Sequence, residues 1–268
     1  MKSSKKESDL HPLHLKIRYR KREFLCYLNT ILKNSSNDQL KVIIFAQGRT
    51  GSTLLESLLE STGHFKKHME ILSTRVNEPI NPYQYLKGLV LRAYPLNFIF
   101  HLKIYHLTTD RKRPVDPEIF LNKLNRDGWK IIYLRRVNKV QHVLSNFVAE
   151  SRGSYEKHNK DREKLKININ CNRFVKMTKQ RIEYSNLEEK ILKSLPHLEL
   201  EYERDLENSD IHSKTVNRVL EYLKLPLKEK PVFSSYKKVN KQSMEELIDN
   251  YDEFIDCLEH NNFQHYLT

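Results

Sequence analysis

Short apolar runs alternate with longer segments of helical periodicity along most of this chain. The clearest runs are KVIIFA, FIFHLKIY, WKIIYL and LELEY, at residues 41–46, 98–105, 129–134 and 198–202. Runs that are apolar on both faces are typical of strands inside a parallel sheet that helices cover on both sides. Helices are predicted between and after them, at 52–62, 82–94, 116–126, 138–150, 171–194, 213–224 and 242–259. The alternation predicts an α/β fold of three layers with a mostly parallel central sheet.

The size and charge of the chain limit its organisation and its partners. Its 268 residues predict one large α/β domain over 41–268, preceded by a basic, partly helical extension over 1–40. Lys and Arg total 47 against 34 Asp and Glu, a formal net charge of +13. This balance favours nucleotides, polyanions, anionic lipids, or sulfated or phosphorylated substrates, and a merely well-solvated surface is the alternative.

Cysteine usage and hydropathy bear on the compartment. Cys26, Cys171 and Cys257 are odd in number and far apart, so we predict neither a disulfide framework nor a zinc site. No run approaches the roughly 20 apolar residues of a membrane span, and the N-terminus lacks the apolar core of a signal peptide. We expect a soluble, cytoplasmic protein.

The first predicted strand leads into a polar turn, GRTGST, and then into a helix. Backbone N–H groups in a glycine-containing turn before a helix N-terminus form an anion site, and the arginine adds a planar cation. An ordinary turn with Ser52 or Thr50 as helix cap is the alternative. The nucleotide-binding pattern G-x-x-x-x-G-K-[ST] does not fit, because no lysine follows at the required position. The candidate anion-binding residues are Gly48, Arg49, Thr50, Gly51, Ser52 and Thr53.

The run GRTGSTLLESLL resembles the 5′-phosphosulfate-binding loop of sulfotransferases that use 3′-phosphoadenosine 5′-phosphosulfate (PAPS). It is most similar to the bacterial carbohydrate and glycolipid branch, whose loop reads R-[ST]-G-S-T-L-L. The resemblance implies a P-loop-like fold, PAPS as sulfuryl donor and no metal. It also implies a second site for the 3′-phosphate, with an arginine at a later strand end and a serine on the following helix.

A second motif is similar to that pattern. WKIIYLRRVNKVQHVLSNFVAE is a predicted strand that ends in Arg135 and Arg136 and is followed by a helix carrying Ser145. Strand register favours Arg136 over Arg135 as the ligand. An arginine fork and a hydroxyl that converge on one phosphate would distinguish a 3′-phosphorylated nucleotide from ATP. Exposed arginines at the end of a strand are the alternative.

The resemblance also points to a catalytic base. In the bacterial branch a glutamate just after the loop helix takes the proton of the acceptor hydroxyl, and Glu70 occupies that position here. His68 is the second candidate, because a neutral imidazole is a competent base near neutral pH. Lys103 and His106, in FHLKIYHL, are similar to a strand whose end faces the sulfuryl group, although His101 stands where that pattern has glycine.

These features imply transfer of a sulfuryl group to a hydroxyl of a carbohydrate, glycolipid or related acceptor. A basic nucleic-acid-binding α/β protein and a small-molecule kinase are the alternatives; scattered tyrosines and the missing loop lysine disfavour them. Lys237, Lys238 or Lys241 could fold back on the nucleotide, by resemblance to the C-terminal segment of the bacterial branch. The basic extension could dock on an anionic membrane, guide an anionic substrate or form an oligomer contact.

Overall fold

A computed structural model of the chain describes residues 13–32, 39–74, 78–152, 165–234, 236 and 242–267. Its centre is a parallel sheet of five strands in the order β2-β3-β1-β4-β5. The strands are β1 (Lys41–Ala46), β2 (Phe65–Lys67), β3 (Asn97–Leu102), β4 (Lys130–Arg135) and β5 (His197–Glu201). The predicted α/β class with a parallel sheet is confirmed.

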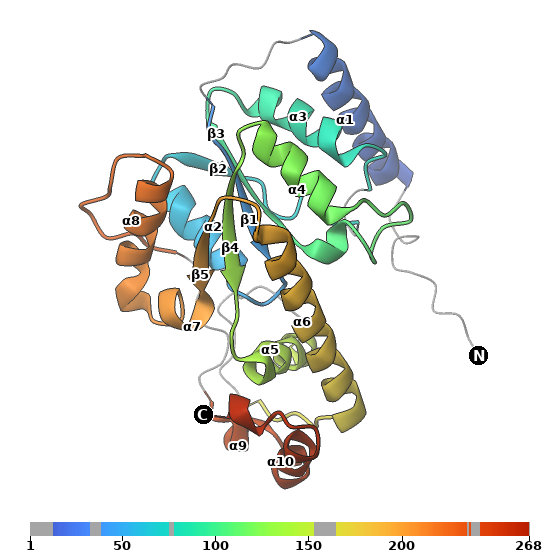
Figure 1. Ribbon diagram of the computed structural model, residues 1–268, viewed down its shortest axis with the longest axis vertical. Helices are drawn as coiled ribbons and strands as arrows, with labels where there is room; N and C mark the ends of the chain where they lie inside the picture. The colour runs from blue at the N-terminus through green and yellow to red at the C-terminus, as the bar shows by residue number, and fades with distance from the viewer. Residues whose placement is uncertain are drawn as a thin grey trace.

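Helices follow the strands in the expected alternation (Figure 1). The longer ones are α1 (Leu13–Leu32), α2 (Ser52–Ser61), α3 (Pro82–Ala93), α4 (Pro117–Arg126), α5 (Lys139–Ser151), α6 (Cys171–Leu192), α8 (His212–Tyr222) and α10 (Tyr251–His260). Shorter ones are α7 (Tyr202–Asp205), α9 (Met244–Leu247) and the 3-10 turns η2 (Ile104–His106), η3 (Ser209–Ile211) and η4 (Gln264–Tyr266).

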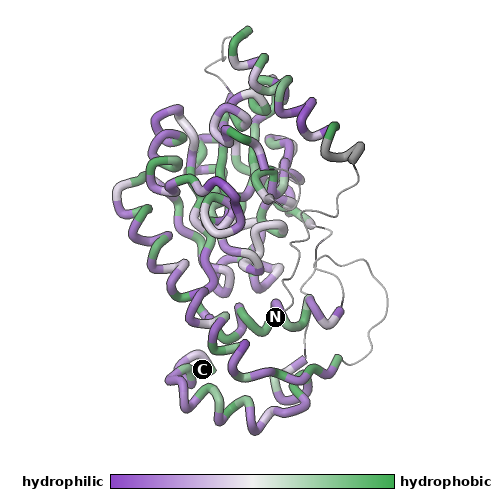
Figure 2. The backbone as a smooth tube through the Cα atoms, turned by 90° about the vertical axis from the view of Figure 1, so that its right-hand side faces the viewer, coloured by the Kyte–Doolittle hydropathy of each residue, from purple (hydrophilic) through white to green (hydrophobic). Residues whose placement is uncertain are grey.

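Alternating strand residues build two cores, one on each face of the sheet. Ile43 and Phe45 of β1 belong to the core under α3, α4 and the end of α6. Val42 and Ile44 belong to the opposite core, under α2 and α8. Figure 2 shows the matching pattern in the helices, whose hydropathy alternates along their length. A helical layer therefore covers each face of the sheet, which makes three layers. The strands are apolar on both faces because both faces are covered.

Local side chains set the helix starts. The predicted helix starts near 82, 116, 138 and 171 are confirmed within one residue. In each case an Asn or Asp directly before the helix accepts a hydrogen bond from a backbone N–H of the first turn, which is the usual N-cap. These caps are Asn81, Asp116, Asn138 and Asn170.

Some predicted elements differ from the structure in extent or number. The strand predicted over 98–105 ends at Leu102, and η2 begins two residues later. The short edge strand β2 was not predicted. The single helix predicted over 242–259 is two helices, α9 and α10, because the chain between them pairs with residues near 167. Ile248 forms a parallel bridge with Ile167, and Asn250 donates its side-chain amide to the carbonyl of Ile169.

The prediction that no cysteines pair is wrong. Cys171, the first residue of α6, forms a disulfide with Cys257 of α10, with the two Cα atoms 6.0 Å apart. The two residues are 86 positions apart in sequence, so their pairing depends on a third core that α5, α6, α9 and α10 build together. Cys26 is unpaired and buried. The cytoplasmic location stays a prediction, but unpaired cysteines no longer support it, because disulfides are rare in reducing compartments.

The helix α1 packs on α3 at close range. A Cβ atom on Gly88 of α3 would lie 2.2 Å from the carbonyl oxygen of Cys26, so only glycine fits there. Glu23 of α1 accepts a hydrogen bond from the backbone N–H of Ile80, just before α3. Among the described residues, no helix has the length and apolar character to cross a membrane.

Candidate active site

The turn between β1 and α2 has an unusual backbone. Arg49 and Gly51 have φ angles of +71° and +88°, the left-handed region that favours glycine. Gly51 caps α2 and makes no side-chain hydrogen bond to it. The capping alternative does not hold, because the Thr50 hydroxyl donates to the carbonyl of Gln47 and the Ser52 hydroxyl bonds to His101. The start of α2 therefore has no side-chain cap of its own.

Two side chains from later in the sequence hold Gly48 in place. His142 of α5 donates its Nε2–H to the carbonyl oxygen of Gly48, at 2.7 Å. The backbone N–H of Gly48 donates to the hydroxyl of Tyr105, at 2.9 Å. A Cβ on Gly48 would lie 2.8 Å from the same hydroxyl. Because His142 is fully buried, its pKa lies well below the usual value, and the ring stays neutral beside the turn.

Arg136, one residue after β4, reaches the turn. Its Nη1 donates to the carbonyl oxygen of Arg49, at 3.4 Å. Its guanidinium stacks over the ring of Tyr202, 4.6 Å from the centroid, and its Nε lies 3.6 Å from Glu203. The side chain is only 8% exposed. Two motifs that are 87 residues apart in the sequence thus meet at one edge of the sheet.

Arg135 points elsewhere. Its guanidinium lies 2.6 Å from Glu199 and 2.5 Å from Glu201, both on the neighbouring strand β5. Alternation along a strand sends successive side chains to opposite faces, which separates Arg135 from Arg136. Of the two arginines, Arg136 is the one that contacts the turn.

Ser145 lies on α5, one turn after His142. Its hydroxyl donates to the carbonyl oxygen of His142, at 2.7 Å, and no hydrogen bond joins it to Arg136. Residues three apart lie on the same side of a helix. Ser145 therefore shares a helix face with the residue that holds Gly48, and its hydroxyl bonds within α5.

Glu70, Lys103 and His106 form a cluster beside the turn. The Lys103 ammonium lies 2.5 Å from one carboxylate oxygen of Glu70, and Nε2 of the buried His106 lies 3.4 Å from the other. Lys103 also neighbours the turn, since a Cβ on Gly48 would lie 3.4 Å from its Nζ. Burial alone would raise the pKa of Glu70, but the contacts with His106 and Lys103 outweigh it and hold this pKa well below its usual range.

His68 lies apart from this cluster. Its ring stacks on Phe98 with centroids 4.0 Å apart, near the start of β3. Phe98 precedes Leu102, the strand end, by four residues, or roughly 13 Å of extended chain. Burial lowers the pKa of His68 to about 4, so its ring is neutral. The structure brings Glu70 to the turn and does not bring the ring of His68 there.

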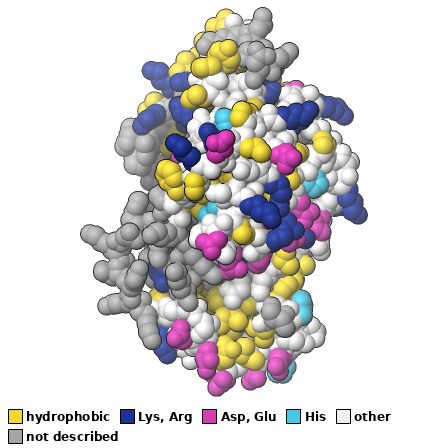
Figure 3. Space-filling view, turned by 90° about the vertical axis from the view of Figure 1, so that its left-hand side faces the viewer, with side chains coloured by type: hydrophobic (Ala, Val, Ile, Leu, Met, Phe, Trp, Pro, Cys, Tyr) yellow, Lys and Arg dark blue, Asp and Glu magenta, His cyan; other side chains and the backbone are white. Residues whose placement is uncertain are grey.

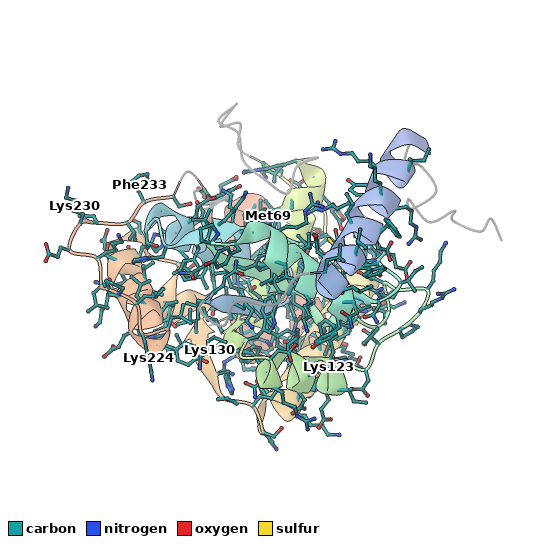
Figure 4. The ribbon with its side chains drawn as sticks, turned by 90° about the horizontal axis from the view of Figure 1, so that it is seen from above. Met69, Lys123, Lys130, Lys224, Lys230 and Phe233 are labelled. Carbon is teal, nitrogen blue, oxygen red and sulfur yellow. A yellow bond between two sulfur atoms is a disulfide. The ribbon has the colours of Figure 1, made fainter. Side chains whose placement is uncertain are left out.

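Sequence reasoning missed a buried pair that links the turn to this cluster. His101 bonds through Nδ1 to the Ser52 hydroxyl at 2.8 Å, and its Nε2 lies 3.8 Å from Glu56. Glu56 accepts hydrogen bonds from the backbone N–H groups of His68 and Met69, next to Glu70. Met69 lies near the middle of the molecule in Figure 4. A carboxylate on the apolar face of α2 was the signal in the sequence.

A second missed cluster lies under the turn. Gln47 donates to Glu188 of α6 at 3.0 Å, and Lys139 of α5 donates to Ser185, which Gln47 also contacts. Burial raises the pKa of Glu188 to about 7. Arg181, also of α6, lies near Gln47 and the ring of Tyr105. These residues fix the end of β1 from a helix more than 130 positions away.

Thr53 is half-buried in the first turn of α2. Lys237, Lys238 and Lys241 lie outside the described residues. In the described part of the chain, no group of three or more His, Cys, Asp or Glu side chains has the arrangement of a metal site.

Comparisons with known proteins give little further support. No protein-family model matches the chain, and no curated protein matches it. Among solved structures, the chain is similar to mouse sulfotransferase SULT7A1 complexed with PAP. The two are 11% identical with a TM-score of 0.43, and the match covers 90% of this chain and 68% of that one. A similarity at this level carries no argument about fold or activity.

Proposed function

We propose that this protein is a PAPS-dependent sulfotransferase that acts on a hydroxyl of a carbohydrate or glycolipid. The observation that carries the proposal is the meeting of three segments at one edge of the sheet. The turn around Arg49 contacts Arg136, which follows β4, and neighbours Lys103, which is paired with Glu70. The carboxyl edge of a parallel sheet is where ligands bind in folds of this class.

In this proposal the turn holds the phosphosulfate end of PAPS. The uncapped start of α2 directs backbone N–H groups and the positive end of the helix dipole at an anion. Arg49 adds a fixed positive charge. Arg136, already desolvated and stacked on Tyr202, would hold the 3′-phosphate together with Ser145. The protein supplies the positive charge that transfer needs, so the proposal includes no metal.

The chemistry is an in-line displacement at sulfur. The acceptor oxygen forms a bond to sulfur while the bond from sulfur to the 5′-phosphate oxygen breaks, and the electron pair of that bond leaves with the phosphate. Glu70 takes the proton of the acceptor hydroxyl. Arg49 and Lys103 stabilise the charge on the leaving phosphate and the sulfuryl oxygens. The enzyme contributes position and charge, as in phosphoryl transfer.

Lys103 would couple binding of the donor at the turn to the base strength of Glu70. While it is paired with Glu70, the low pKa makes that carboxylate a weak base. A sulfuryl group bound at the turn would attract the Lys103 ammonium away from the carboxylate, and the pKa of Glu70 would rise. The Glu70 carboxylate would then become a stronger base only when the donor is bound. The contacts favour Glu70 over His68, because the ring of His68 stacks near the far end of β3.

Calorimetry with the nucleotide product provides the test. We expect 3′-phosphoadenosine 5′-phosphate to bind tightly and ATP with Mg²⁺ to bind weakly or not at all, because the turn lacks the lysine of a triphosphate loop. Adenosine 5′-monophosphate serves as a matched control, because it lacks only the 3′-phosphate. Preference for ATP would favour a kinase, and affinity for nucleic acid with a steep salt dependence would favour the binding-protein alternative. A soluble, cytoplasmic location belongs to the same proposal.

A further inference from the structure

The helix α1 exposes an apolar stripe on the side away from α3. Its large apolar residues at this side are spaced by three, four and seven positions, which aligns them on one helix face. Phe24, Ile31 and Leu32 are 64%, 79% and 70% exposed. We call this stripe the outer face of α1, and it consists of Ile17, Phe24, Leu25, Leu28, Ile31 and Leu32.

The charges around the outer face have one sign. Arg18, Arg20 and Lys21 are exposed on the same helix. Its one acidic residue, Glu23, is 3% exposed, turned toward α3, and lies 2.6 Å from Arg20. Between residues 17 and 32, the solvent-facing surface therefore carries apolar and basic side chains and no acidic one.

We propose that α1 docks on an anionic membrane surface through its outer face. An interfacial helix buries an apolar face at the headgroup boundary while basic side chains contact anionic lipid. The inner face of α1 stays packed on α3 during docking, because Cys26 is fully buried there. Only the outer side chains enter the interface. The proposal does not depend on the sulfotransferase assignment.

The distribution of charge over the rest of the molecule fits docking through the α1 end. α1 and α10 lie at opposite ends (Figure 1), and α10 exposes four acidic residues, Asp252, Glu253, Asp256 and Glu259. Figure 3 shows acidic side chains gathered along the lower margin, where α9 and α10 lie. An anionic surface would attract the α1 end and repel the α10 end. A role in guiding substrate fits less well, since α5, which bears Ser145, lies at the other end from α1 (Figure 1).

Vesicle flotation of the full chain tests the proposal. We expect binding to phosphatidylcholine vesicles that contain phosphatidylserine, weak binding to pure phosphatidylcholine, and loss of binding as salt rises. Lys21→Glu should lower vesicle partition by at least roughly fivefold, the effect of one basic contact. Phe24→Ser should lower it by roughly tenfold, through lost apolar burial.

Matched controls lie on the other side of the molecule. Phe233 is 76% exposed, Lys230 is exposed, and Figure 4 shows both on the side opposite α1. Phe233→Ser and Lys230→Glu should bind vesicles as the unchanged protein does. The proposal is overturned if the Phe24 and Lys21 variants retain full binding while folded by circular dichroism, or if neither vesicle type binds. It is also overturned if light scattering finds a dimer that Phe24→Ser dissociates, since the outer face would then join two copies of the chain.

Discussion

The Lys103 ammonium lies 2.5 Å from the carboxylate of Glu70 and beside Gly48 of the turn. One side chain thus contacts both the candidate base and the candidate donor site. Glu70 is half-buried and its pKa is held low, so it is ionised throughout the neutral range. An ionised carboxylate with a movable cation can accept a proton once that cation turns to a bound sulfuryl group.

Glu70→Gln should abolish most turnover and leave nucleotide binding intact. The amide cannot accept the acceptor's proton, and loss of a general base lowers kcat by roughly 10²–10⁴-fold. The affinity for 3′-phosphoadenosine 5′-phosphate should change by less than about threefold, because the turn and Arg136 are untouched. Steady-state kinetics and calorimetry measure the two effects.

Glu60→Gln is the control for this substitution. Glu60 is partly exposed and pairs with Lys67 at 2.6 Å, whereas Glu70 pairs with Lys103 and His106. The Glu60→Gln variant should keep the kinetics of the unchanged protein. If Glu70→Gln turned over at the normal rate, the base would have to be another group.

Arg136→Ala should weaken recognition of the 3′-phosphate. Loss of a charge-assisted contact at a buried site costs roughly 10- to 100-fold in affinity. Binding of 3′-phosphoadenosine 5′-phosphate should fall by that factor, while binding of adenosine 5′-monophosphate should fall much less. Calorimetry with the two nucleotides separates the effects.

The neighbouring arginine provides the comparison. Arg135→Ala removes an equal charge from a side chain that faces Glu199 and Glu201. It should leave the preference between the two nucleotides unchanged. Equal losses for both nucleotides in Arg136→Ala would mean that Arg136 only shapes the turn.

The parts of this site that could be predicted from sequence are those whose signal is local. The turn after β1 combines a buried run, two glycines and a helix start within about a dozen residues, and Arg136 follows a second buried run directly. Because parallel strands share a carboxyl edge, two such turns are expected to approach each other. The contact between Arg136 and Arg49 follows that logic.

The supporting residues could not be predicted, because their position depends on tertiary packing. Tyr105 and His142 reach Gly48 from segments 57 and 94 residues away. The disulfide was missed for the same reason, since spacing alone does not bring Cys171 to Cys257. The pairing needs the core around Phe174 and Phe254, which brings α6 against α10.

Gly51→Ala should destabilise the protein and impair the turn. Gly51 has a φ of +88°, and an added Cβ would lie 2.8 Å from the Tyr202 ring. The backbone penalty is about 1–2 kcal/mol, and the ring contact adds about 1–3 kcal/mol more. Urea unfolding measures the sum, and nucleotide binding should weaken as well.

Gly63→Ala isolates the backbone contribution. Gly63 has a φ of +78°, but an added Cβ would meet nothing within 4 Å. Its free energy of unfolding should fall by only about 1–2 kcal/mol. Equal costs at the two positions would show that Tyr202 yields to the extra methyl group.

Removing the disulfide should destabilise the α6–α10 unit. A double variant, Cys171→Ser with Cys257→Ser, loses a crosslink between residues 86 positions apart. The expected loss is about 2–4 kcal/mol in the free energy of unfolding. Reductant should shift the melting temperature of the original protein and leave that of the double variant unchanged. An equal shift in both would contradict the pairing.

The pH dependence of stability should report the buried Glu188. Burial raises its pKa from 4.5 in the unfolded chain to about 7, so the folded state binds more protons between those values. The free energy of unfolding must then fall as pH rises through that window. The contribution is roughly 3 kcal/mol across the window.

Glu188→Gln removes this contribution, since an amide does not titrate. Urea unfolding near pH 5 and near pH 8 should give a smaller difference for the variant than for the original protein. Part of the slope should remain, because burial also raises the pKa of Glu56 to about 7. Glu189→Gln is the control, since it makes the same substitution at the next position of α6, where the side chain is 48% exposed. A slope that Glu188→Gln leaves intact would mean that Glu188 stays ionised in the folded state, with Lys139 as its countercharge.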